Sequence, residues 1–244
     1  MLNEGMRRYS ARRAVRALAA IIFFAAVPAI RGQQTYVGRY DVYAGFIYLD
    51  SPKLSLGERG FHTQTGIRLR EWCSLGFDYS ISSGVAAFTP DLFPTALQQQ
   101  LGALLKQLIA AGRIPPSYTL HVPVHSDTQT FAAGPQFAYH RWAPVTLFIR
   151  PSIGAVRETA TPHPKDAAAS LIVAQLAPSG RKQDWTPFYG FGGGVDLNVS
   201  RRFAVRVQAD FVHEHLFSDL LKDGRNTVRL SIGPALQFGR NVMR

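Results

Sequence analysis

Apolar and polar residues alternate with a period of two over much of this chain. In residues 40–49 (YDVYAGFIYL), the even positions Tyr40, Val42 and Phe46 fall on one face, and Asp41 falls on the other. Such alternation is typical of a β-strand with one apolar and one polar face. The pattern recurs with turns between the runs and predicts eight strands, at residues 40–49, 61–70, 73–81, 131–140, 145–154, 188–198, 203–211 and 228–238.

The connections between these strands fall into two kinds. Short ones are expected at residues 71–73, 140–144 and 199–202, and longer ones at residues 50–60, 84–128, 157–186 and 217–226. Short and long connections alternate along the chain, as in up-and-down transmembrane barrels. We therefore expect an all-β, antiparallel, eight-stranded barrel, with its long loops at one end and both termini at the other.

The second long loop contains a segment with helical periodicity. In residues 95–111 (TALQQQLGALLKQLIAA), six leucine and isoleucine residues share one face, and Gly112 supplies a C-terminal stop. We expect an amphipathic helix from Thr95 to Ala111. It could pack against neighbouring loops, or it could lie on a lipid surface.

The first 32 residues have the pattern of a secretory signal peptide. Six arginines surround an apolar run at residues 17–29, and small residues follow it, so cleavage is expected after Ala29 or Gly32. An uncleaved membrane anchor is the alternative, but a run of about 13 residues is shorter than the roughly 20 that span a bilayer. The domain assignment is therefore a signal peptide at residues 1–32 and a barrel domain at residues 36–240.

The formal charge of +11 does not indicate a nucleic-acid partner. Six of the 27 basic residues and one of the 16 acidic residues lie in the expected signal peptide, which leaves a formal charge of +6. The lysines, moreover, fall in predicted loops or helices, as at Lys53, Lys106, Lys165 and Lys182. We expect no nucleic acid among the partners.

The composition of the polar face indicates that it lies inside the barrel. It combines small residues with arginines and aspartates, whereas a solvated surface usually carries lysine and glutamate. Aromatic residues gather near the expected strand ends, as in the girdles of membrane barrels. The alternative is a soluble lipocalin-like carrier with an apolar interior. The predicted interior charge network consists of Asp41, Arg68, Arg70, Asp78, Arg150, Asp196, Arg206, Asp210 and Arg229.

Three segments give the chain a resemblance to a known family. YDVYAGFIYLD, RGFHTQTGIRLREWCSLGFDYSISSG and TQTFAAGPQFAYHRW resemble the barrel of bacterial OmpA-type outer-membrane proteins. The resemblance implies a cell outer-membrane location with periplasmic termini. It also implies contacts with outer-membrane lipids and lipopolysaccharide, and insertion by the barrel-assembly machinery. We expect the barrel domain only, without a peptidoglycan-binding domain, and the last strand lacks the usual terminal aromatic residue because residues 239–244 follow Phe238.

The candidates for chemistry are weak. His213 and His215 could share a metal ion on one strand face, but a surface contact is the simpler reading, and we predict no metal or cofactor. A lipid A-modifying enzyme would need a nucleophile, a base and an acid to converge, and no specific motif supports one. The candidates for such a site are His125, Ser126, His213, Glu214 and Ser218.

The function that these patterns favour is a non-catalytic structural or surface-interaction scaffold. Because eight strands leave an interior that side chains fill, oppositely charged residues there are expected to plug the barrel. A narrow gated pore is the first alternative, followed by the lipid A-modifying enzyme and the soluble carrier. The extracellular ligand of a scaffold cannot be read from the sequence.

Overall fold

Each predicted run of alternating residues forms a strand, and most strands are longer than the pattern suggested. The computed structural model describes residues 34–221 and 224–243. The signal peptide expected at residues 1–32 lies outside the described residues. The strands are β1 (Gly38–Ser51), β2 (Leu56–Arg70), β3 (Cys73–Phe88), β4 (Val122–Tyr139), β5 (Val145–Pro162), β6 (Lys182–Asn198), β7 (Phe203–Glu214) and β8 (Arg225–Asn241).

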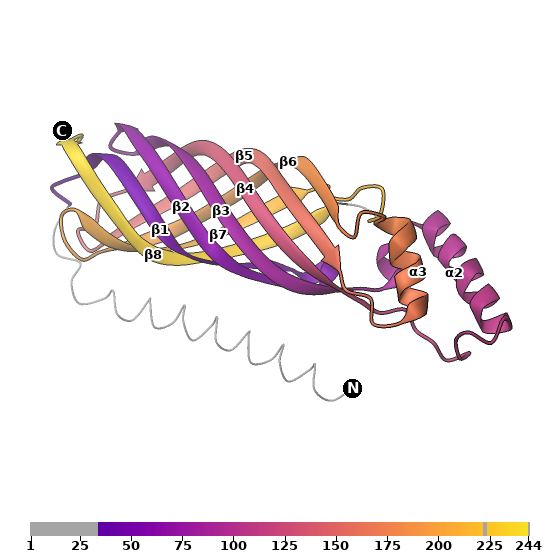
Figure 1. Cartoon of the computed structure of the whole chain (residues 1–244). Coiled ribbons are helices and arrows are strands. Elements are labelled where there is room, and N and C mark those ends of the chain that lie inside the picture. The colour runs from indigo at the N-terminus through magenta and orange to yellow at the C-terminus, as the bar shows by residue number, and fades with distance from the viewer. Residues whose placement is uncertain (1–33, 222–223, 244) are drawn as a thin grey trace.

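The eight strands close into one barrel in sequence order, so the predicted up-and-down topology is confirmed. Every pair is antiparallel, and β8 closes the barrel by pairing with β1, for example at Tyr40 with Phe238. The strands are strongly tilted, and the C-terminus lies at the end that carries the short turns (Figure 1). Small register shifts occur between Gly38 and Tyr40 and between Arg68 and Arg70.

The prediction of a long connection at residues 50–60 is wrong. β1 and β2 continue pairing to the end, at Ser51 with Leu56, and a single 3-10 turn, η1 (Pro52–Leu54), joins them. Ser55 ends this turn with a left-handed φ of 50°. The alternation weakens at Pro52 and Gly57, so the sequence pattern placed the strand ends too early.

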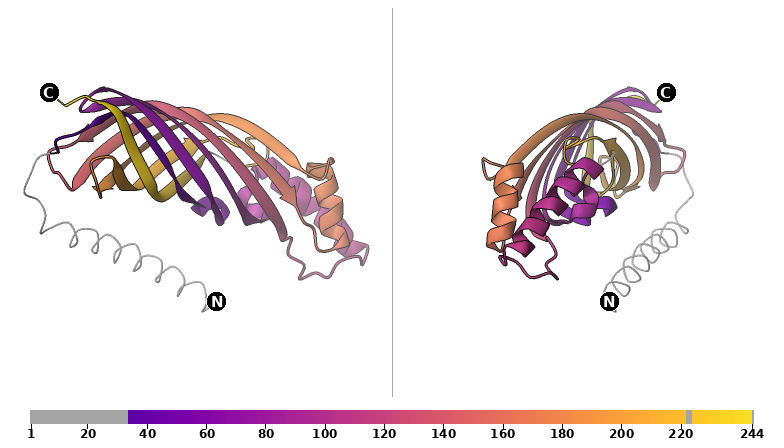
Figure 2. Two further views of the ribbon diagram at one scale, coloured as in Figure 1. Left: turned by 60° about the vertical axis from the view of Figure 1, so that its left-hand side comes forward. Right: turned by 90° about the vertical axis from the view of Figure 1, so that its right-hand side faces the viewer.

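The connections between β3 and β4 and between β5 and β6 contain helices, which lie at the end of the barrel opposite the C-terminus (Figures 1 and 2). The predicted amphipathic helix is present as α2 (Thr95–Ala110), preceded by the 3-10 turn η2 (Pro90–Leu92). A second helix, α3 (Ala167–Leu176), was not predicted. Neither helix has the length and apolar character needed to cross a membrane, and the same holds throughout the part of the chain that the structure describes.

α3 is fixed by a side-chain cap at its N-terminus. The Asp166 carboxylate accepts a hydrogen bond from the backbone N–H of Ala169 at 2.7 Å, as an N-cap residue does. The hydroxyl of Tyr118 donates to the same carboxylate at 2.9 Å. Burial, followed by this hydrogen bond, raises the pKa of Tyr118 to about 12. Asp166 therefore ties the chain that follows α2 to the start of α3.

The helices and the far ends of the strands share an apolar core, which we call the cap core. Phe93, Ile172 and Phe217 from the connections pack with inward-facing strand residues such as Val124 and Val156. Leu101 is the buried residue of α2, and Leu97, Leu104 and Leu105 pack partly buried beside it. Of the two placements left open for this helix, packing against neighbouring segments is the one that the structure has.

Candidate functional site

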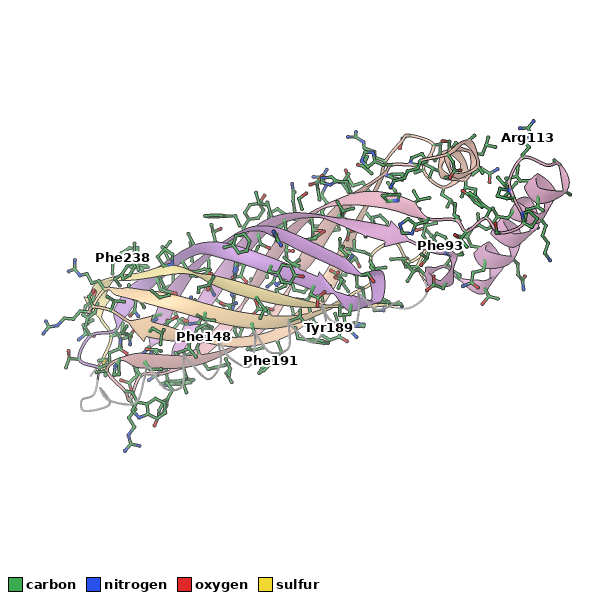
Figure 3. The ribbon with its side chains drawn as sticks, turned by 90° about the horizontal axis from the view of Figure 1, so that it is seen from below. Phe93, Arg113, Phe148, Tyr189, Phe191 and Phe238 are labelled. Carbon is green, nitrogen blue, oxygen red and sulfur yellow. The ribbon has the colours of Figure 1, made fainter. Side chains whose placement is uncertain are left out.

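The outer wall of the barrel is apolar over a continuous band. Outward-facing side chains such as Phe61 (54% exposed) and Ile153 (71% exposed) leave most of their apolar surface uncovered. Phe191, Tyr189 and Phe238 stand along the wall in Figure 3. Exposure of so many large apolar side chains to water is unfavourable, because the hydrophobic effect drives such side chains into the interior of a folded protein.

The interior carries the charges that the outer wall lacks. Arg150 and Arg206 are 1% and 0% exposed, so each guanidinium is completely enclosed. Buried charges of this kind are stable only when they are paired and hydrogen-bonded. They form three networks that follow one another along the barrel axis, which we call the lower, middle and upper networks, starting from the short turns.

The lower network is centred on Arg206 of β7. Its Nε lies 2.7 Å from Asp196 Oδ1, its Nη2 lies 2.9 Å from Asp196 Oδ2, and this bidentate pairing is the strong geometry for arginine and carboxylate. The same guanidinium donates to Gln64 at 2.6 Å and to Asp41 at 3.3 Å. The ring of Phe148 lies 4.8 Å from its central carbon. Residues of four other strands therefore contact this one side chain of β7.

Arg68 completes the lower network at the turn end of the barrel. It donates to the side chain of Gln237 at 3.0 Å and to the backbone oxygen of Gly38 at 3.2 Å. Both acceptors belong to the strands that close the barrel, β8 and β1. Arg68 therefore links β2 to the closing seam.

The middle network consists of two aspartate–arginine pairs and a histidine. Asp78 forms an ion pair with Arg150, and Arg229 lies 3.2 Å from Asp210. Arg229 also approaches Asp78 at 4.0 Å, and the His62 ring lies 3.9 Å from the same carboxylate. Asp210 and Arg229 face each other on neighbouring strands, whereas Asp78 of β3 is approached by Arg150 from β5 and by Arg229 from β8, so the network extends across the lumen.

The upper network holds three glutamates around one arginine. Arg225 lies 2.7 Å from Glu158 and 2.5 Å from Glu214. Glu58 receives hydrogen bonds from Ser82 at 2.7 Å and from Thr128 at 2.8 Å. Ser126 donates to Glu158 at 2.7 Å. The hydroxyl groups thus supply donors where arginines are fewer than carboxylates.

Eight of the nine residues of the predicted charge network are buried inside the barrel. The exception is Arg70, which is exposed at the end of β2, so its placement in the interior is wrong. The register shift between Arg68 and Arg70 breaks the alternation just before the turn. Among the eight, Arg68 contacts Gly38 and Gln237, and the other seven form the aspartate–arginine pairs of the lower and middle networks.

Sequence reasoning missed most of the upper network. Glu58, Glu158 and Arg225 lie beyond the ends of the predicted strands, and Glu214 appears in the sequence prediction only among the candidates for a lipid A-modifying site. The signal was present in the sequence, because Glu58 continues the inward parity of His62 and Gln64, and Glu158 continues that of Arg150. Extending each alternation past its last apolar residue would have found them.

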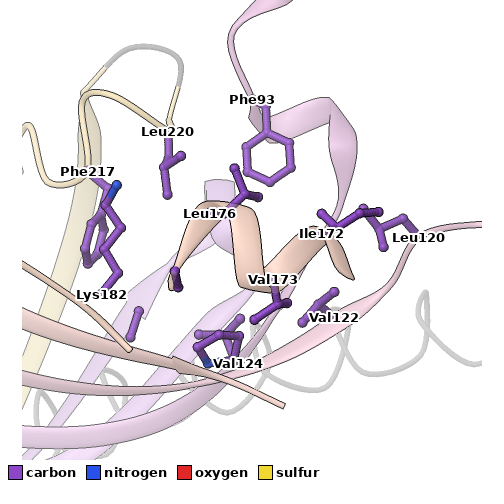
Figure 4. Close-up of a pocket in the computed structure, with 13 residues that line it drawn as sticks. Phe93, Leu120, Val122, Val124, Ile172, Val173, Leu176, Lys182, Phe217 and Leu220 are labelled. Carbon is purple, nitrogen blue, oxygen red and sulfur yellow. The ribbon is translucent and has the colours of Figure 1, made fainter. Parts of the chain in front are cut away.

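An apolar pocket of about 70 Å³ lies in the cap core (Figure 4). It is lined by residues of α3, of the strand ends and of the segment around Phe217, and its lining is apolar apart from Lys182. The Lys182 ammonium forms an ion pair with Asp219. A pocket of this size and lining fits a small part of an apolar group and offers no reactive side chain.

The residues considered for catalysis do not converge. Ser126 faces the interior and is bonded to Glu158, whereas the neighbouring His125 faces outward and lies 3.1 Å from Ser83. Glu214 points inward to Arg225, while Ser218 is exposed outside. Since nucleophile and base must be within hydrogen-bond reach, these residues do not form a catalytic set.

His213 and His215 do lie side by side on the outside, with ring centroids 4.9 Å apart. His213 is already hydrogen-bonded to Asn226 at 2.6 Å. Within residues 34–221 and 224–243, no group of three or more histidine, cysteine, aspartate or glutamate side chains has the spacing of a metal site. The pair is a surface feature beside Tyr189.

The fold and the interior together define the class of protein. It is a closed, eight-stranded, up-and-down β-barrel, as the sequence predicted, and it has an apolar outer wall and an ion-paired interior.

The comparisons with known proteins concern the fold alone. No protein-family model matches the chain, and no curated protein matches it. Among solved structures, Neisserial surface protein A aligns with a TM-score of 0.48 and 10% identity, over 82% of this chain and 96% of that one. Ail, the attachment invasion locus protein of Yersinia pestis, gives 0.46 and 10%, over 83% and 99%. The outer membrane protein OprG from Pseudomonas aeruginosa gives 0.41 and 8%, over 84% and 98%.

Proposed function

We propose that the chain is an integral outer-membrane β-barrel protein that acts as a non-catalytic scaffold for its helical cap. The observation that carries the proposal is the inversion of the barrel, with apolar side chains on the outer wall and paired charges inside. A soluble carrier would have the opposite arrangement. A closed barrel suits a bilayer because its strands satisfy every backbone group without an open edge.

The aromatic residues support a membrane band of limited height. Tyr40, Trp72 and Tyr139 are exposed near the short turns, and Tyr48 and Trp185 are exposed toward the cap. Tyrosine and tryptophan prefer the two interfaces of a bilayer. Beyond the cap-side girdle, the outward positions become polar, as at Asp50, Arg59, Asp127, Arg157 and Gln183.

The packing of the interior supports a function as a scaffold rather than as a pore. The lower and middle networks cross the lumen, and the cap core fills the opposite end with apolar side chains such as Leu56 and Val124. An open path for ions would require displacement of both the charge networks and the cap core. The helices and the connecting chain of the cap then present the surface available to a partner.

In this proposal the cap faces the outside of the cell, and both termini face the periplasm. Outer-membrane lipids and lipopolysaccharide surround the band, and the barrel-assembly machinery inserts the chain after signal-peptide cleavage. The alternation of short turns with long connections is the support for this orientation.

Gel mobility with and without boiling tests the membrane barrel. Folded membrane barrels resist sodium dodecyl sulfate until they are heated, so the membrane-extracted protein should migrate differently before and after boiling. Identical mobility, together with recovery of the protein in the soluble periplasmic fraction, would contradict the proposal and favour the soluble carrier.

Two further measurements separate the scaffold from its alternatives. The scaffold predicts silent planar bilayers, whereas a pore predicts ion conductance that changes when Arg150 or Arg206 is substituted. A lipid A-modifying enzyme predicts an altered lipid A mass spectrum on overexpression, and the scaffold predicts an unchanged one.

A further inference from the structure

Three depressions meet at Trp72, at the turn end of the barrel. The first, of about 380 Å³, is lined by Leu69, Arg70, Glu71 and Val242 beside Trp72. The second, of about 250 Å³, shares Glu71 and Trp72 and adds Tyr139 and Arg141. We call these two together the rim groove, because they lie on the turns that join β2 to β3 and β4 to β5.

The third depression runs from the rim along the outer wall and is apolar. It has a volume of about 290 Å³ and is lined by Trp72, Phe137, Tyr139, Leu147 and Ile149, with the backbone of β4 and β5 beneath them. We call it the wall furrow. Trp72 stacks on Phe137 with ring centroids 6.1 Å apart, which fixes the junction between the groove and the furrow.

The charges in the rim groove have a particular order. Arg70 lines one half, Arg141 lines the other, and the carboxylate-bearing Glu71 lines both. All three residues are exposed, and they lie at the end of β2 and in the turns that follow β2 and β4. The lining of the groove thus includes two arginines and one glutamate, a set of charges that matches a ligand carrying an anion and a cation close together.

We propose that the rim groove and wall furrow hold one glycerophospholipid whose headgroup carries a primary ammonium, that is, phosphatidylethanolamine. Arg70 and Arg141 bind its phosphodiester, Glu71 accepts hydrogen bonds from its ammonium, and one acyl chain lies in the furrow against Phe137 and Ile149. The assignment rests on the proposed membrane location. A purely anionic lipid would leave Glu71 facing a negative charge, and a quaternary ammonium has no N–H to donate.

Trp72 itself provides the readout. Removing Trp142 and Trp185 by W142F and W185F leaves one tryptophan, at the junction of groove and furrow. This protein is inserted into phosphatidylcholine vesicles that contain equal mole fractions of phosphatidylethanolamine, phosphatidylglycerol or phosphatidylcholine with brominated chains. Bromine quenches the tryptophan on contact, so the loss of fluorescence reports which lipid occupies the site.

The proposal predicts that brominated phosphatidylethanolamine quenches Trp72 with an apparent association constant about threefold above that of phosphatidylcholine, as expected of a few exposed charge contacts. The double variant R70Q/R141Q should remove this preference. E71Q should lower the preference for phosphatidylethanolamine and raise that for phosphatidylglycerol. Soluble glycerophosphoethanolamine should not displace the lipid, because it has no acyl chain for the furrow.

Two controls belong to the same barrel. Arg201 and Arg202 are exposed on the turn between β6 and β7 and line neither the groove nor the furrow, so R201Q/R202Q should leave the quenching unchanged. A protein that retains only Trp185, at the other edge of the band, should be quenched equally by all three lipids.

Equal quenching of Trp72 by the three lipids, or a preference that survives R70Q/R141Q, would overturn the site. A preference for phosphatidylglycerol that E71Q does not change would overturn the assigned headgroup. Displacement by glycerophosphoethanolamine would show a phosphate site without a lipid and would also overturn it. If the membrane location itself is wrong, neither Trp72 nor Trp185 is quenched and the heat-dependent mobility shift is absent, which distinguishes the two failures.

Discussion

At the scale of single residues, the interior arginines hold this barrel together through partners on other strands. Arg206 is the clearest case, since its guanidinium contacts Asp196, Asp41 and Gln64 and leaves no exposed surface. Removing one member of such a group leaves the others charged and unpaired. The networks are therefore sites of high sensitivity to substitution, although a well-packed apolar replacement of the whole group could be tolerated.

Arg206→Met should lower the free energy of unfolding by about 3–5 kcal/mol, because Asp196 and Asp41 lose their counterion inside the barrel. Urea unfolding in lipid vesicles, followed by tryptophan fluorescence, measures the change. Arg201→Met, at an exposed turn position, is the matched control and should shift the unfolding midpoint very little. Equal effects of the two variants would contradict the role given to the lower network.

His140 predicts a dependence of stability on pH. The residue lies just after β4, where burial and then the nearby Arg68 lower the pKa of its ring to about 4. In the unfolded chain the histidine has its ordinary pKa of about 6.5, so between about pH 6.5 and about pH 4 the unfolded state binds a proton and the folded state does not. Stability is therefore fully present above about pH 6.5 and declines as the pH falls toward about 4, by up to about 3 kcal/mol.

The substitution His140→Gln tests whether His140 causes the change in the free energy of unfolding between these two pH values. The substitution keeps a hydrogen-bonding side chain near Gln34 and Thr146, which lie 3.0 and 3.2 Å from the histidine ring. Unfolding midpoints measured from pH 4 to pH 7 should show a weaker dependence in the variant. A slope as steep as that of the parent protein would assign the effect to other groups.

At the scale of elements, glycines set how closely neighbouring strands approach. A Cβ added at Gly154 of β5 would lie 2.0 Å from the backbone oxygen of Phe131 and 2.9 Å from the Cα of Ala132. Neither backbone atom can move without disturbing the pairing of β4 with β5. By contrast, a Cβ at Gly102 of α2 meets nothing within 4 Å.

Gly154→Ala should therefore destabilise the barrel by about 1–3 kcal/mol, as overpacking does. Gly102→Ala should leave it unchanged or stabilise α2 by about 1 kcal/mol, since alanine favours a helix. Urea unfolding of the two variants beside the parent gives the comparison. A neutral Gly154→Ala would show that the two strands can separate locally.

The cap is expected to loosen independently of the barrel. Asp166→Ala removes both the N-cap of α3 and the hydrogen bond from Tyr118, at a cost of about 0.5–2 kcal/mol to the cap. Hydrogen exchange should become faster in residues 167–176, with the strands β1 and β8 protected as before. Faster exchange spread evenly over the strands would mean that cap and barrel unfold as one unit.

At the scale of the whole molecule, the strand number, the barrel topology and the charged interior were accessible from the sequence because alternation reports which side of a strand faces inward. The ends of the strands were not, since Gly57 interrupts the pattern although its backbone still pairs with Asp50. α3 was missed although Asp166 gives a start signal, because its run of alanines has little periodicity. The precise partners of Arg206 and Arg225 depend on distances across the lumen, which no spacing along the chain encodes.

The closing of the barrel by β1 and β8 has a consequence for how the molecule assembles. Each of the remaining pairings joins two strands that follow one another in sequence. The seam between β1 and β8 instead joins residues some two hundred positions apart, as in the hydrogen bond of 2.9 Å from the Val37 N–H to the Asn241 side chain. Bringing distant segments together costs the most chain entropy and slows folding. The seven pairings between strands that are neighbours in sequence can form locally, so we expect the seam to form last and most slowly. Until it forms, the sheet exposes two unpaired edges to any other strand nearby.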